Sequence, residues 1–564
     1  MDDLLLEEES KAVAPAASAL PSVALLAGTA FALTGCGGEG GGSGSGAQPA
    51  AAAPVGPPPP TPADMSRFLG QAAMGATREE LDRTLSMGIP AWIDEQLAMA
   101  RPVKHWDWLV TGGYNVIANQ GNTTGFDPVM WRQFIASPDQ LRQRVGLALL
   151  DFIVVSIDSV GGSWRQFSVA AFIDILWDNA FGNFRTLLER ISTNAAMAQF
   201  LTFLGNTRAN TARGTSPDEN YARELMQLFA LGPQKLNSDG TVQMQGDRAI
   251  ETYTQEDVAG LARVFTGWNL DSTDNSVPDR YGRPLIQNTS QHETGAKTFL
   301  GTTIPAGTAG AESLRIALDT IFAHPNCPPF VSKTLIQRLV TSNPSPGYVA
   351  RVSAKFENDG TGVRGNLAAV VKAILLDEEA RNKSLAANAT AGKLREPITR
   401  LTGWARAFGV TSPSNAWAIG DTSNPTNRLG QGAGHAASVF SFFRPGYTPP
   451  NSEIAKQNLV APEMQLTNEP SVFGYINYMM SLVQNGTGDV KADYTDLLTR
   501  TANSATLVDE VNTVLAGGQI SAATALQIRQ AVDSIDNLTA TGPANRLHTA
   551  ILLVMASPEY LVLK

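Results

Sequence analysis

Apolar residues recur at spacings of three and four along the chain from Asp64 onward, which is the period of a helix that buries one face. Signals for helix starts accompany this pattern, because a hydroxyl residue repeatedly stands three positions before an acid or an amide. This arrangement begins at Thr77, Ser137, Ser216 and Thr254. Alternating strand patterns are scarce, and short ones occur near 241–244 and 298–303. The sequence therefore predicts a mainly α-helical fold, a large multi-helix globular body with at most short β-hairpins.

Seven segments carry the helical period clearly enough to be assigned individual helices. They are 140–156, 311–323, 329–341, 348–358, 367–381, 394–408 and 544–556. Gly88 and Gly232 stand where the caps of helix C-termini belong. We find no internal repeat of fixed length, so the sequence predicts one body over residues 64–564.

The N-terminus carries a short apolar run, about 19–33, that ends in Leu33-Thr34-Gly35-Cys36. The run is short for a membrane span but fits the core of a signal peptide. Its last four residues resemble a bacterial lipobox, which implies cleavage before Cys36 and lipid attachment to that thiol. We therefore predict a lipoprotein signal peptide at 1–35, and the alternatives are an uncleaved apolar segment or a coincidental cysteine. The usual positive residues before the run are absent, since Lys11 alone accompanies five acids.

Residues 36–63 are rich in Gly, Ser, Ala and Pro and contain little that a core would bury. They predict a disordered tether between the lipid anchor and the body. Gly37 stands where an aspartate would favour retention in the inner membrane. By analogy with known lipoproteins, we expect an outer-membrane protein that faces the periplasm or the cell surface. The membrane, reached through Cys36, is the first predicted partner.

Composition argues against several classes of function. The formal net charge is −10, and no basic run offers the footprint that nucleic-acid binding needs, so we expect no nucleic-acid partner. The two cysteines, Cys36 and Cys327, rule out a disulfide framework and a zinc site built from several thiolates. The five histidines form no local metal motif, and the local signatures of hydrolases and nucleotide-binding enzymes are missing. The sequence indicates no cofactor.

One segment, SPDENYARELMQLFALG at 216–232, concentrates charge in an otherwise weakly charged chain. Ser216 and Glu219 are predicted to form a capping box, with Pro217 in the first helical position. Arg223 stands four residues after Glu219, the spacing of a helical ion pair. Thr254 is predicted to cap the next helix in the same way. Most of the charge in the segment is therefore interpreted as a helix start.

Many segments of the body resemble the bacterial family called domain of unknown function 1800. They include DQLRQRVGLAL, NAFGNFRTLLE, PDENYARELMQLFALG, TYTQEDVAGLARVFTGW, FVSKTLIQRLVTSNPSPGYVARV, GKLREPITRL and SVFSFFRPGY, in this order. The resemblance extends from about Asp64 to Leu563. It implies an exported protein with no established activity. It also implies a partner from a second uncharacterised family, related to sulfatases and alkaline phosphatases, whose genes often lie beside those of the first.

Four residues are candidates for a functional site. Glu224 lies at the edge of the apolar face of its helix, so its half-buried carboxylate needs an arginine, a hydrogen-bond donor or a metal as partner. His292 precedes a glycine-containing loop, where the family commonly has a His-Asp pair and this chain has His292-Glu293. Asp257 is interpreted first as a capping acid, and Arg395 as one half of a buried pair with Glu224 or Asp257. Glu224 and His292 are also weak candidates for metal ligands.

The sequence leaves two functions open. The first is an exported, lipid-anchored protein of the cell envelope that acts as a binding or assembly partner. The second is a hydrolase acting on an exported polymer or envelope substrate, with a catalytic site assembled from distant segments around Glu224, Asp257, His292 and Arg395. Convergence of these four side chains on an open cavity would favour the enzyme, and their dispersal through the core would favour the binding protein. The aromatic stretch at 440–447 is interpreted as core, with a platform for sugar or peptide as the alternative.

Overall fold

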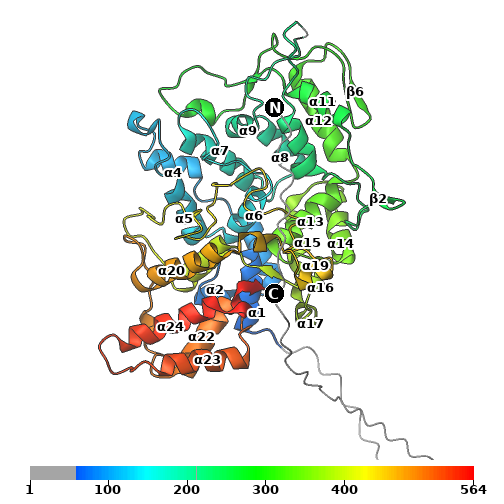
Figure 1. The fold of residues 1–564 in the computed structure, drawn as a ribbon. Coiled ribbons are helices and arrows are strands. Elements are labelled where there is room, and N and C mark those ends of the chain that lie inside the picture. The colour runs from blue at the N-terminus through cyan, green and yellow to red at the C-terminus, as the bar shows by residue number, and fades with distance from the viewer. Residues whose placement is uncertain (1–58, 211) are drawn as a thin grey trace, which may run out of the picture. The chain divides into compact units, whose positions relative to one another are not determined.

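The structure is a computed structural model that describes residues 59–210 and 212–564 of the 564-residue chain. Over these residues it has 25 α-helices and four two-stranded antiparallel sheets (Figure 1). The prediction of a mainly helical body with short hairpins is confirmed. The predicted signal peptide at 1–35, Cys36 and most of the linker lie outside the described residues. The first helix begins at Pro62, with Thr61 as its cap, slightly before the predicted start of the body.

The first part of the body is entirely helical. It consists of α1 (Pro62–Ala72), α2 (Arg78–Met87), α3 (Ile89–Ala98), α4 (His105–Thr111), α5 (Phe126–Ala136), α6 (Gln140–Leu150), α7 (Arg165–Asp178), α8 (Phe184–Ser192), α9 (Ala195–Phe200) and α10 (Asn220–Glu224). The π-helix η2 (Leu225–Ala230) continues α10 without a break.

The middle part holds three of the four sheets and a compact set of helices. Its strands are β1 (Met244–Gln245), β2 (Arg248–Ala249), β3 (Trp268–Asn269), β4 (Ile286–Gln287), β5 (Lys297–Phe299) and β6 (Thr302–Ile304), paired in chain order. Its helices are α11 (Gln255–Ala262), α12 (Gly310–Ala323), α13 (Cys327–Leu339), α14 (Pro346–Glu357), α15 (Leu367–Leu376), α16 (Glu378–Arg381) and α17 (Lys383–Ala386). The hairpin predicted near 298–303 is thus confirmed.

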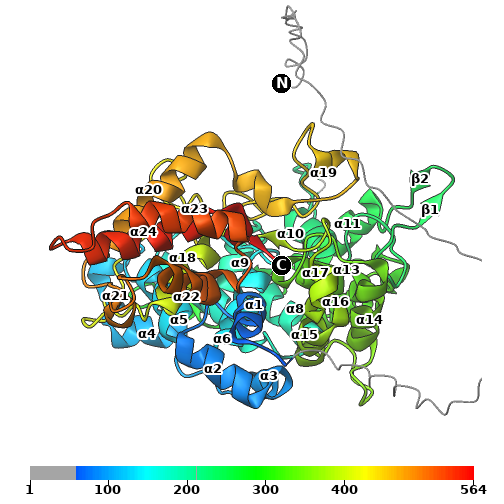
Figure 2. The same ribbon diagram turned by 90° about the horizontal axis from the view of Figure 1, so that it is seen from below.

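The last part begins with β7 (Lys393–Leu394), which pairs with β8 (Val562–Leu563) at the other end of this part. Between them lie α18 (Pro397–Ala407), α19 (Glu453–Lys456), the 3-10 turn η5 (Pro462–Leu466), α20 (Glu469–Asn485), α21 (Thr495–Leu498), α22 (Ser504–Ala516), α23 (Ala522–Asp533), α24 (Gly542–Ala556) and α25 (Pro558–Leu561). Figure 2 shows α22, α23 and α24 packed together, with α20 against α24. Among the described residues, no helix is long and apolar enough to cross a membrane.

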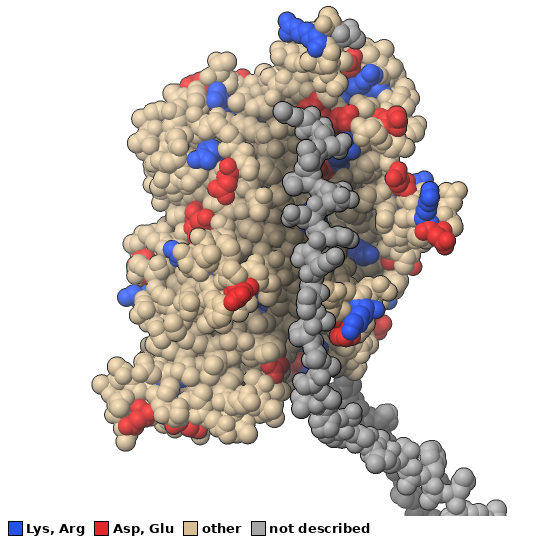
Figure 3. All heavy atoms as spheres, in the orientation of Figure 1, with Lys and Arg blue, Asp and Glu red and all other residues tan. Residues whose placement is uncertain are grey.

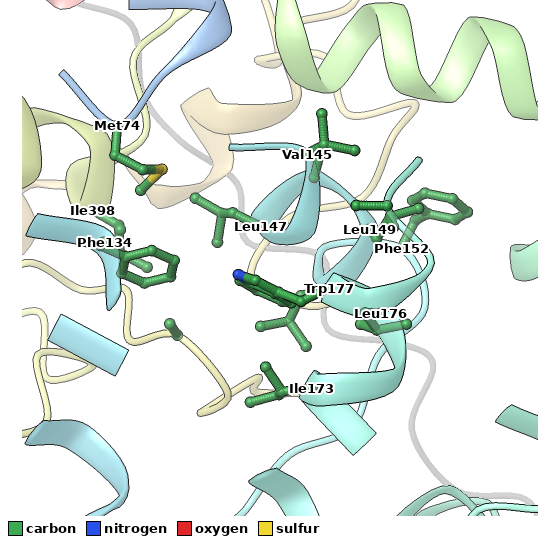
Figure 4. Packing of buried hydrophobic residues seen from close by; sticks show 14 of the residues in the cluster. Met74, Phe134, Val145, Leu147, Leu149, Phe152, Ile173, Leu176, Trp177 and Ile398 are labelled. Atoms are coloured by element: carbon green, nitrogen blue, oxygen red, sulfur yellow. The ribbon is translucent and has the colours of Figure 1, made fainter. Parts of the chain in front are cut away.

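Helix α6 is the centre of the core, because all of its residues are buried. Its apolar side chains meet α5 and α7 around Trp177, as Figure 4 shows. Gly146 is required there, since a Cβ at this position would lie 2.4 Å from the Trp177 ring. The polar side chains of α6 are buried with partners of their own: Gln143 accepts a hydrogen bond of 2.7 Å from the indole of Trp177. The sequence thus places polar groups deep inside the body.

Of the four predicted capping boxes, two are wrong, one is complete at Thr254, and one forms only in part, because Thr77 caps its helix while the Glu80 carboxylate binds Arg406. At 216–219 the helix starts only at Asn220, because Asp218 accepts a hydrogen bond of 2.8 Å from the Asn220 N–H and so replaces Ser216 and Glu219 as the cap. At 137–140 the helix starts after Asp139, and Ser137 donates its hydroxyl to that residue instead of capping. The box at Thr254 is confirmed, as are the Thr77 cap and the ion pair of Arg223 with Glu219 at 3.0 Å.

Candidate functional site

A cavity of about 1360 Å³ opens beside α13, α16 and α17, which Figure 1 places next to one another. One wall is the C-terminal half of α13 and the turn that follows it. Others come from η2, from the chain after α17, and from 439–448 and 458–460 on either side of α19. Segments far apart in the sequence therefore surround one hollow, the arrangement expected of a binding site.

The cavity wall combines aromatic rings with many neutral polar side chains. The rings are those of Phe152, Phe330, Phe440 and Tyr447. Amides and hydroxyls are supplied by Gln227, Gln234, Gln337, Asn343, Asn388, Thr334, Thr341, Thr390 and Thr448. Amide and hydroxyl groups both donate and accept hydrogen bonds, so such a wall suits a polar ligand with many hydroxyl or amide groups.

A buried cluster of charged side chains lies under this cavity and meets it at Asp151 and Arg338. Asp151 follows the end of α6, and Arg338 lies in the last turn of α13. The other members are Arg144 of α6, Lys393 of β7, Glu396 at the start of α18 and Glu463 of η5. All six are buried. We refer to these six residues as the ionic cluster.

Lys393 organises one side of the ionic cluster. Its ammonium group lies 2.9 Å from the Glu463 carboxylate and 3.3 Å from that of Glu396. It also donates to the backbone carbonyl of Arg338 at 2.6 Å. Strand β7 holds it in place, because pairing with β8 fixes the backbone on both sides. A buried ammonium with three oxygen partners is a satisfied charge.

Asp151 and Glu396 form a carboxyl pair whose members behave oppositely. Burial, and then the negative charge of Glu396, raise the pKa of Asp151 far above its ordinary value. Burial opposes ionisation of Glu396 too, but Lys393, Arg144 and Arg338 outweigh it and lower the pKa of Glu396 to about 2. Among the described residues, Asp151 Oδ2 has no hydrogen-bond partner, and Oδ1 accepts a hydrogen bond of 3.3 Å from the Ser441 hydroxyl. Asp151 therefore keeps its proton to a higher pH than Glu396 does.

The arginines of the ionic cluster are less well paired. Arg144 donates to the backbone carbonyl of Arg338 at 2.6 Å, and Arg338 to that of Asp151 at 3.4 Å. The Arg338 guanidinium also stacks on the Phe443 ring, 4.4 Å from its centre. Arg338 Nη1, and both Nε and Nη1 of Arg144, have no hydrogen-bond partner among the residues described. Buried guanidinium groups with free N–H donors are uncommon.

Glu224 lies three residues before Gln227, which lines the cavity. It ends α10, and the π-helix that follows presents Gln227 and Leu228 to the cavity. Burial raises the pKa of the Glu224 carboxyl, with Arg223 opposing. Its Oε2 atom has no partner within the part of the chain that the structure describes. Glu224 is more deeply buried than the half-buried carboxylate predicted, and among the described residues neither the arginine nor the donor predicted for it is found there.

The other three predicted residues lie in different surroundings. Asp257 caps α11 and accepts a hydrogen bond of 2.6 Å from the Leu300 N–H, which fastens the β5–β6 hairpin. His292 is buried with Nδ1 3.0 Å from the Thr266 carbonyl, and burial lowers its pKa. Arg395 donates to the Tyr560 carbonyl at 2.7 Å and lies over that residue's ring.

These four residues are not brought together. Over the described chain, no hydrogen bond or ion pair joins any two of Glu224, Asp257, His292 and Arg395, and none of them lines the cavity. The buried pair predicted for Arg395 with Glu224 or Asp257 is therefore not found. Its neighbour Glu396 belongs to the ionic cluster instead. No set of three or more His, Cys, Asp or Glu side chains suited to a metal occurs in the described residues.

A family model described as "Protein of unknown function (DUF1800)" matches residues 67–562. The chain belongs to the DUF1800 family. A search of curated proteins and a search of solved structures gave no match. In this DUF1800 protein, four of the segments that carry the resemblance each bring part of the cavity or its floor: Arg144, Arg338, the Lys393–Glu396 stretch and Phe443. Segments that carry the resemblance to the family therefore come together at the ionic cluster.

The aromatic stretch of the DUF1800 protein is divided between the core and the cavity wall. Phe443 is buried and packs on Arg338, as a core residue does. Phe440 and Tyr447 are partly exposed and line the cavity. The sequence signal for the site was therefore present in SVFSFFRPGY. The ionic cluster was missed because its members are spread over more than 300 residues and each looks ordinary in its own helix.

His435 lies in a second charged group, away from this cavity. Its Nε2 is 2.8 Å from Asp127 and its Nδ1 is 2.9 Å from Asp158. Although burial opposes it, the hydrogen bond and charge of Asp127 raise the pKa of His435 to about 9. Both ring nitrogens are engaged with carboxylates, so the group is an ion pair that joins α5 to the chain after α18.

Proposed function

We propose that the protein is an exported, lipid-anchored protein of the cell envelope that binds an oligosaccharide segment of an envelope polymer in the cavity beside α13. The observation that carries the proposal is the cavity itself. Its volume of about 1360 Å³ exceeds the roughly 300–1,000 Å³ typical of pockets for small molecules. A ligand of several linked units fits this volume better than a single metabolite.

The chemistry of the wall favours a carbohydrate. Sugar rings present an apolar face and a rim of hydroxyl groups. Phe440 and Tyr447 offer flat surfaces for such faces, and the surrounding amide and hydroxyl side chains offer donors and acceptors for the rim. A mainly apolar ligand would leave these amides without partners, which costs free energy.

The envelope location is part of the proposal and rests on the Leu33–Cys36 motif. A lipid at Cys36, followed by the linker at 36–63, places the body next to the polymers of the envelope. The expected partner of the sulfatase and alkaline phosphatase type acts on substituted polymers in the same compartment. In this proposal, the binding or assembly role predicted from the sequence is to deliver or retain such a polymer. Figure 3 shows positive and negative side chains interspersed on one face of the body.

Binding is tested on the full chain by isothermal titration calorimetry with oligosaccharides of increasing length. We expect affinity to rise with length until the cavity is filled. Tyr447→Ala and Phe440→Ala should each weaken binding about tenfold, or about 1.4 kcal/mol. Phe473→Ala is the matched control, because Phe473 is an exposed aromatic of α20 outside the cavity. Equal affinities for all three variants and the wild type would refute the assignment of the site.

The export and the anchor are tested separately. Cells that express the wild type should incorporate a radiolabelled fatty acid into the protein, and the Cys36→Ala variant should not. Fractionation of the envelope then reports the membrane. Incorporation that survives Cys36→Ala would contradict the anchor without affecting the cavity.

A hydrolase is the second candidate, and Asp151 is the observation in its favour. A carboxyl group that keeps its proton at the edge of a cavity has the property required of a general acid. Reducing ends released from the oligosaccharides that bind would measure such an activity. We expect Asp151→Asn to abolish it while leaving binding intact. Release that continues in this variant would exclude Asp151 as the acid.

A further inference from the structure

Four buried arginines of the described chain have no carboxylate partner. They are Arg144 and Arg338 of the ionic cluster, and Arg395 and Arg400, which neither belong to it nor line the cavity; each is at least nine-tenths buried. The ion pairs within 4.0 Å found in the described chain include none of the four. Arg395 and Arg400 stack on the rings of Tyr560 and Tyr475 instead. Buried charges in proteins are normally paired, so this group is short of negative charge.

The pair of Asp151 and Glu396 increases this shortage of negative charge. The ionic cluster holds three cationic side chains, those of Arg144, Arg338 and Lys393, and three carboxyl groups, those of Asp151, Glu396 and Glu463. Because the pKa of Asp151 is raised well above its ordinary value, its carboxyl group contributes less negative charge than the other two. Glu396 and Glu463 are both engaged by Lys393. The two arginines of the cluster are therefore left with little compensating negative charge.

The wall of the cavity is positive as well. Its cationic residues are Arg67, Lys333, Arg338, Arg444 and Lys564, against the acids Asp151 and Glu379. The chain as a whole carries −10. A cavity with a sign opposite to that of its protein concentrates ligands of the protein's own charge.

We infer that Arg338 forms an anion subsite at the floor of the cavity, which takes a carboxylate, sulfate or phosphate group carried by the bound oligosaccharide. Arg338 borders the cavity, its guanidinium stacks on the Phe443 ring, and its buried Nη1 has no hydrogen-bond partner among the described residues. Arg144 lies behind it and adds positive charge without reaching the cavity wall. A planar guanidinium held in one orientation is well suited to an oxyanion. This inference rests on the proposed function, because the anionic group belongs to the same ligand.

Matched pairs of ligands test the subsite and identify its anion. One pair is an oligogalacturonate and its neutral methyl ester, and the other is a sulfated oligosaccharide and its desulfated form. The wild type should bind the acidic member of at least one pair about tenfold or more tightly. Arg338→Gln should remove that preference and change the affinity for the neutral member less than about twofold. Arg338→Lys, which keeps the charge but not the planar fork, should retain part of the preference.

Arg444→Gln is the control for general attraction, because Arg444 is an exposed cation in the same wall. It should alter the affinity for acidic ligands far less than Arg338→Gln does. Equal losses in the two variants would mean that the field of the whole cavity, and no subsite, selects the anion. Equal affinity of the wild type for both members of each pair overturns the inference whatever the variants do, and leaves the proposed function standing.

Inorganic sulfate and phosphate separate the subsite from the polymer. Either ion, titrated at constant ionic strength, should bind the wild type and fail to bind Arg338→Gln. If no oligosaccharide binds but an inorganic anion does so through Arg338, the proposed function fails and the subsite survives. If neither anion distinguishes the wild type from Arg338→Gln, the subsite is refuted.

Discussion

Replacing Asp151 by asparagine should make the protein more stable near neutral pH and flatten the dependence of its stability on pH. Burial holds the pKa of Asp151 in the folded chain well above its ordinary value, so the folded chain keeps this proton to a higher pH than the unfolded chain does. An acid whose folded pKa is raised therefore lowers the free energy of unfolding as pH rises above its ordinary value of 3.8, until the folded pKa is reached. The Asp151→Asn variant cannot ionise, so this dependence on pH is absent from it.

The expected size follows from linkage. Each pH unit in that interval costs the wild type about 1.4 kcal/mol relative to the variant. Between about pH 5 and about pH 7 the difference in free energy of unfolding should therefore change by about 2.7 kcal/mol while Asp151 stays protonated. Glu396 does not contribute to this slope, because its pKa is lowered to about 2 and its share is lost only as pH falls below its ordinary 4.5.

Urea unfolding followed by tryptophan fluorescence measures the effect, with both proteins studied at each pH. Asp82→Asn is the control, since this exposed carboxyl of α2 should leave the slope unchanged. Glu396→Gln tests the other half of the pair: it leaves the charge of Lys393 under-compensated and should cost about 3–5 kcal/mol. If the free energy of unfolding depends on pH in the same way in the wild type and in Asp151→Asn, the pKa of Asp151 is not raised and the reasoning is refuted. Equal losses of stability in Asp151→Asn and Glu396→Gln would refute it as well.

Three further predictions concern the core, the second charged group and Glu224. Gly146→Ala should destabilise the protein by about 1–3 kcal/mol, because the added Cβ meets the Trp177 ring. Gly403→Ala in α18 is the control and should not destabilise it, because the nearest atom to its Cβ would be 3.7 Å away. Thermal unfolding of both variants measures the difference. His435→Gln should lower the free energy of unfolding by about 1–2 kcal/mol below about pH 6.5. The wild type loses this contribution as pH rises through about 9, the pKa of His435 in the folded chain. The free energies of unfolding of the two proteins should therefore converge in alkaline buffer. Glu224→Gln should fold and be at least as stable as the wild type at neutral pH, because burial raises the pKa of this carboxyl; a loss of more than about 1 kcal/mol would show that an ionised Glu224 has a partner.

Local physics explains why the helices were predictable from the sequence. A capping hydroxyl and the period of the apolar residues act within a few positions, so Thr254 and the helices at 311–323 and 544–556 were correctly read. Ser216 was misread because Asp218, two residues later, competes for the same backbone N–H groups. Choosing between two adjacent caps depends on Asn206, twelve residues earlier, which accepts a hydrogen bond from the Asp218 backbone N–H.

The candidate site depended on contacts that no local pattern encodes. The buried pair was predicted between Arg395 and Glu224 or Asp257. The buried ion pair at this point of the chain belongs instead to Glu396, whose partners include Gln431 and Lys393, which also pairs with Glu463. Arg144 stands on a helix whose faces are all buried, so periodicity could not show that an arginine was turned inward. One usable signal was present: an arginine in the apolar run RVGLALL needs a polar neighbour, whatever the fold.

The two ends of the body are fastened to each other. The hydroxyl of Ser66 in α1 donates to the Val514 carbonyl, 448 residues away, and Arg395 holds the backbone of Tyr560, 165 residues further on. When the ribosome has made the first four hundred or so residues, the segments against which α1 and β7 pack have not yet been synthesised. Native packing of these elements waits for the final stretch of synthesis, and until then the apolar faces of the nascent chain stay exposed to chaperones.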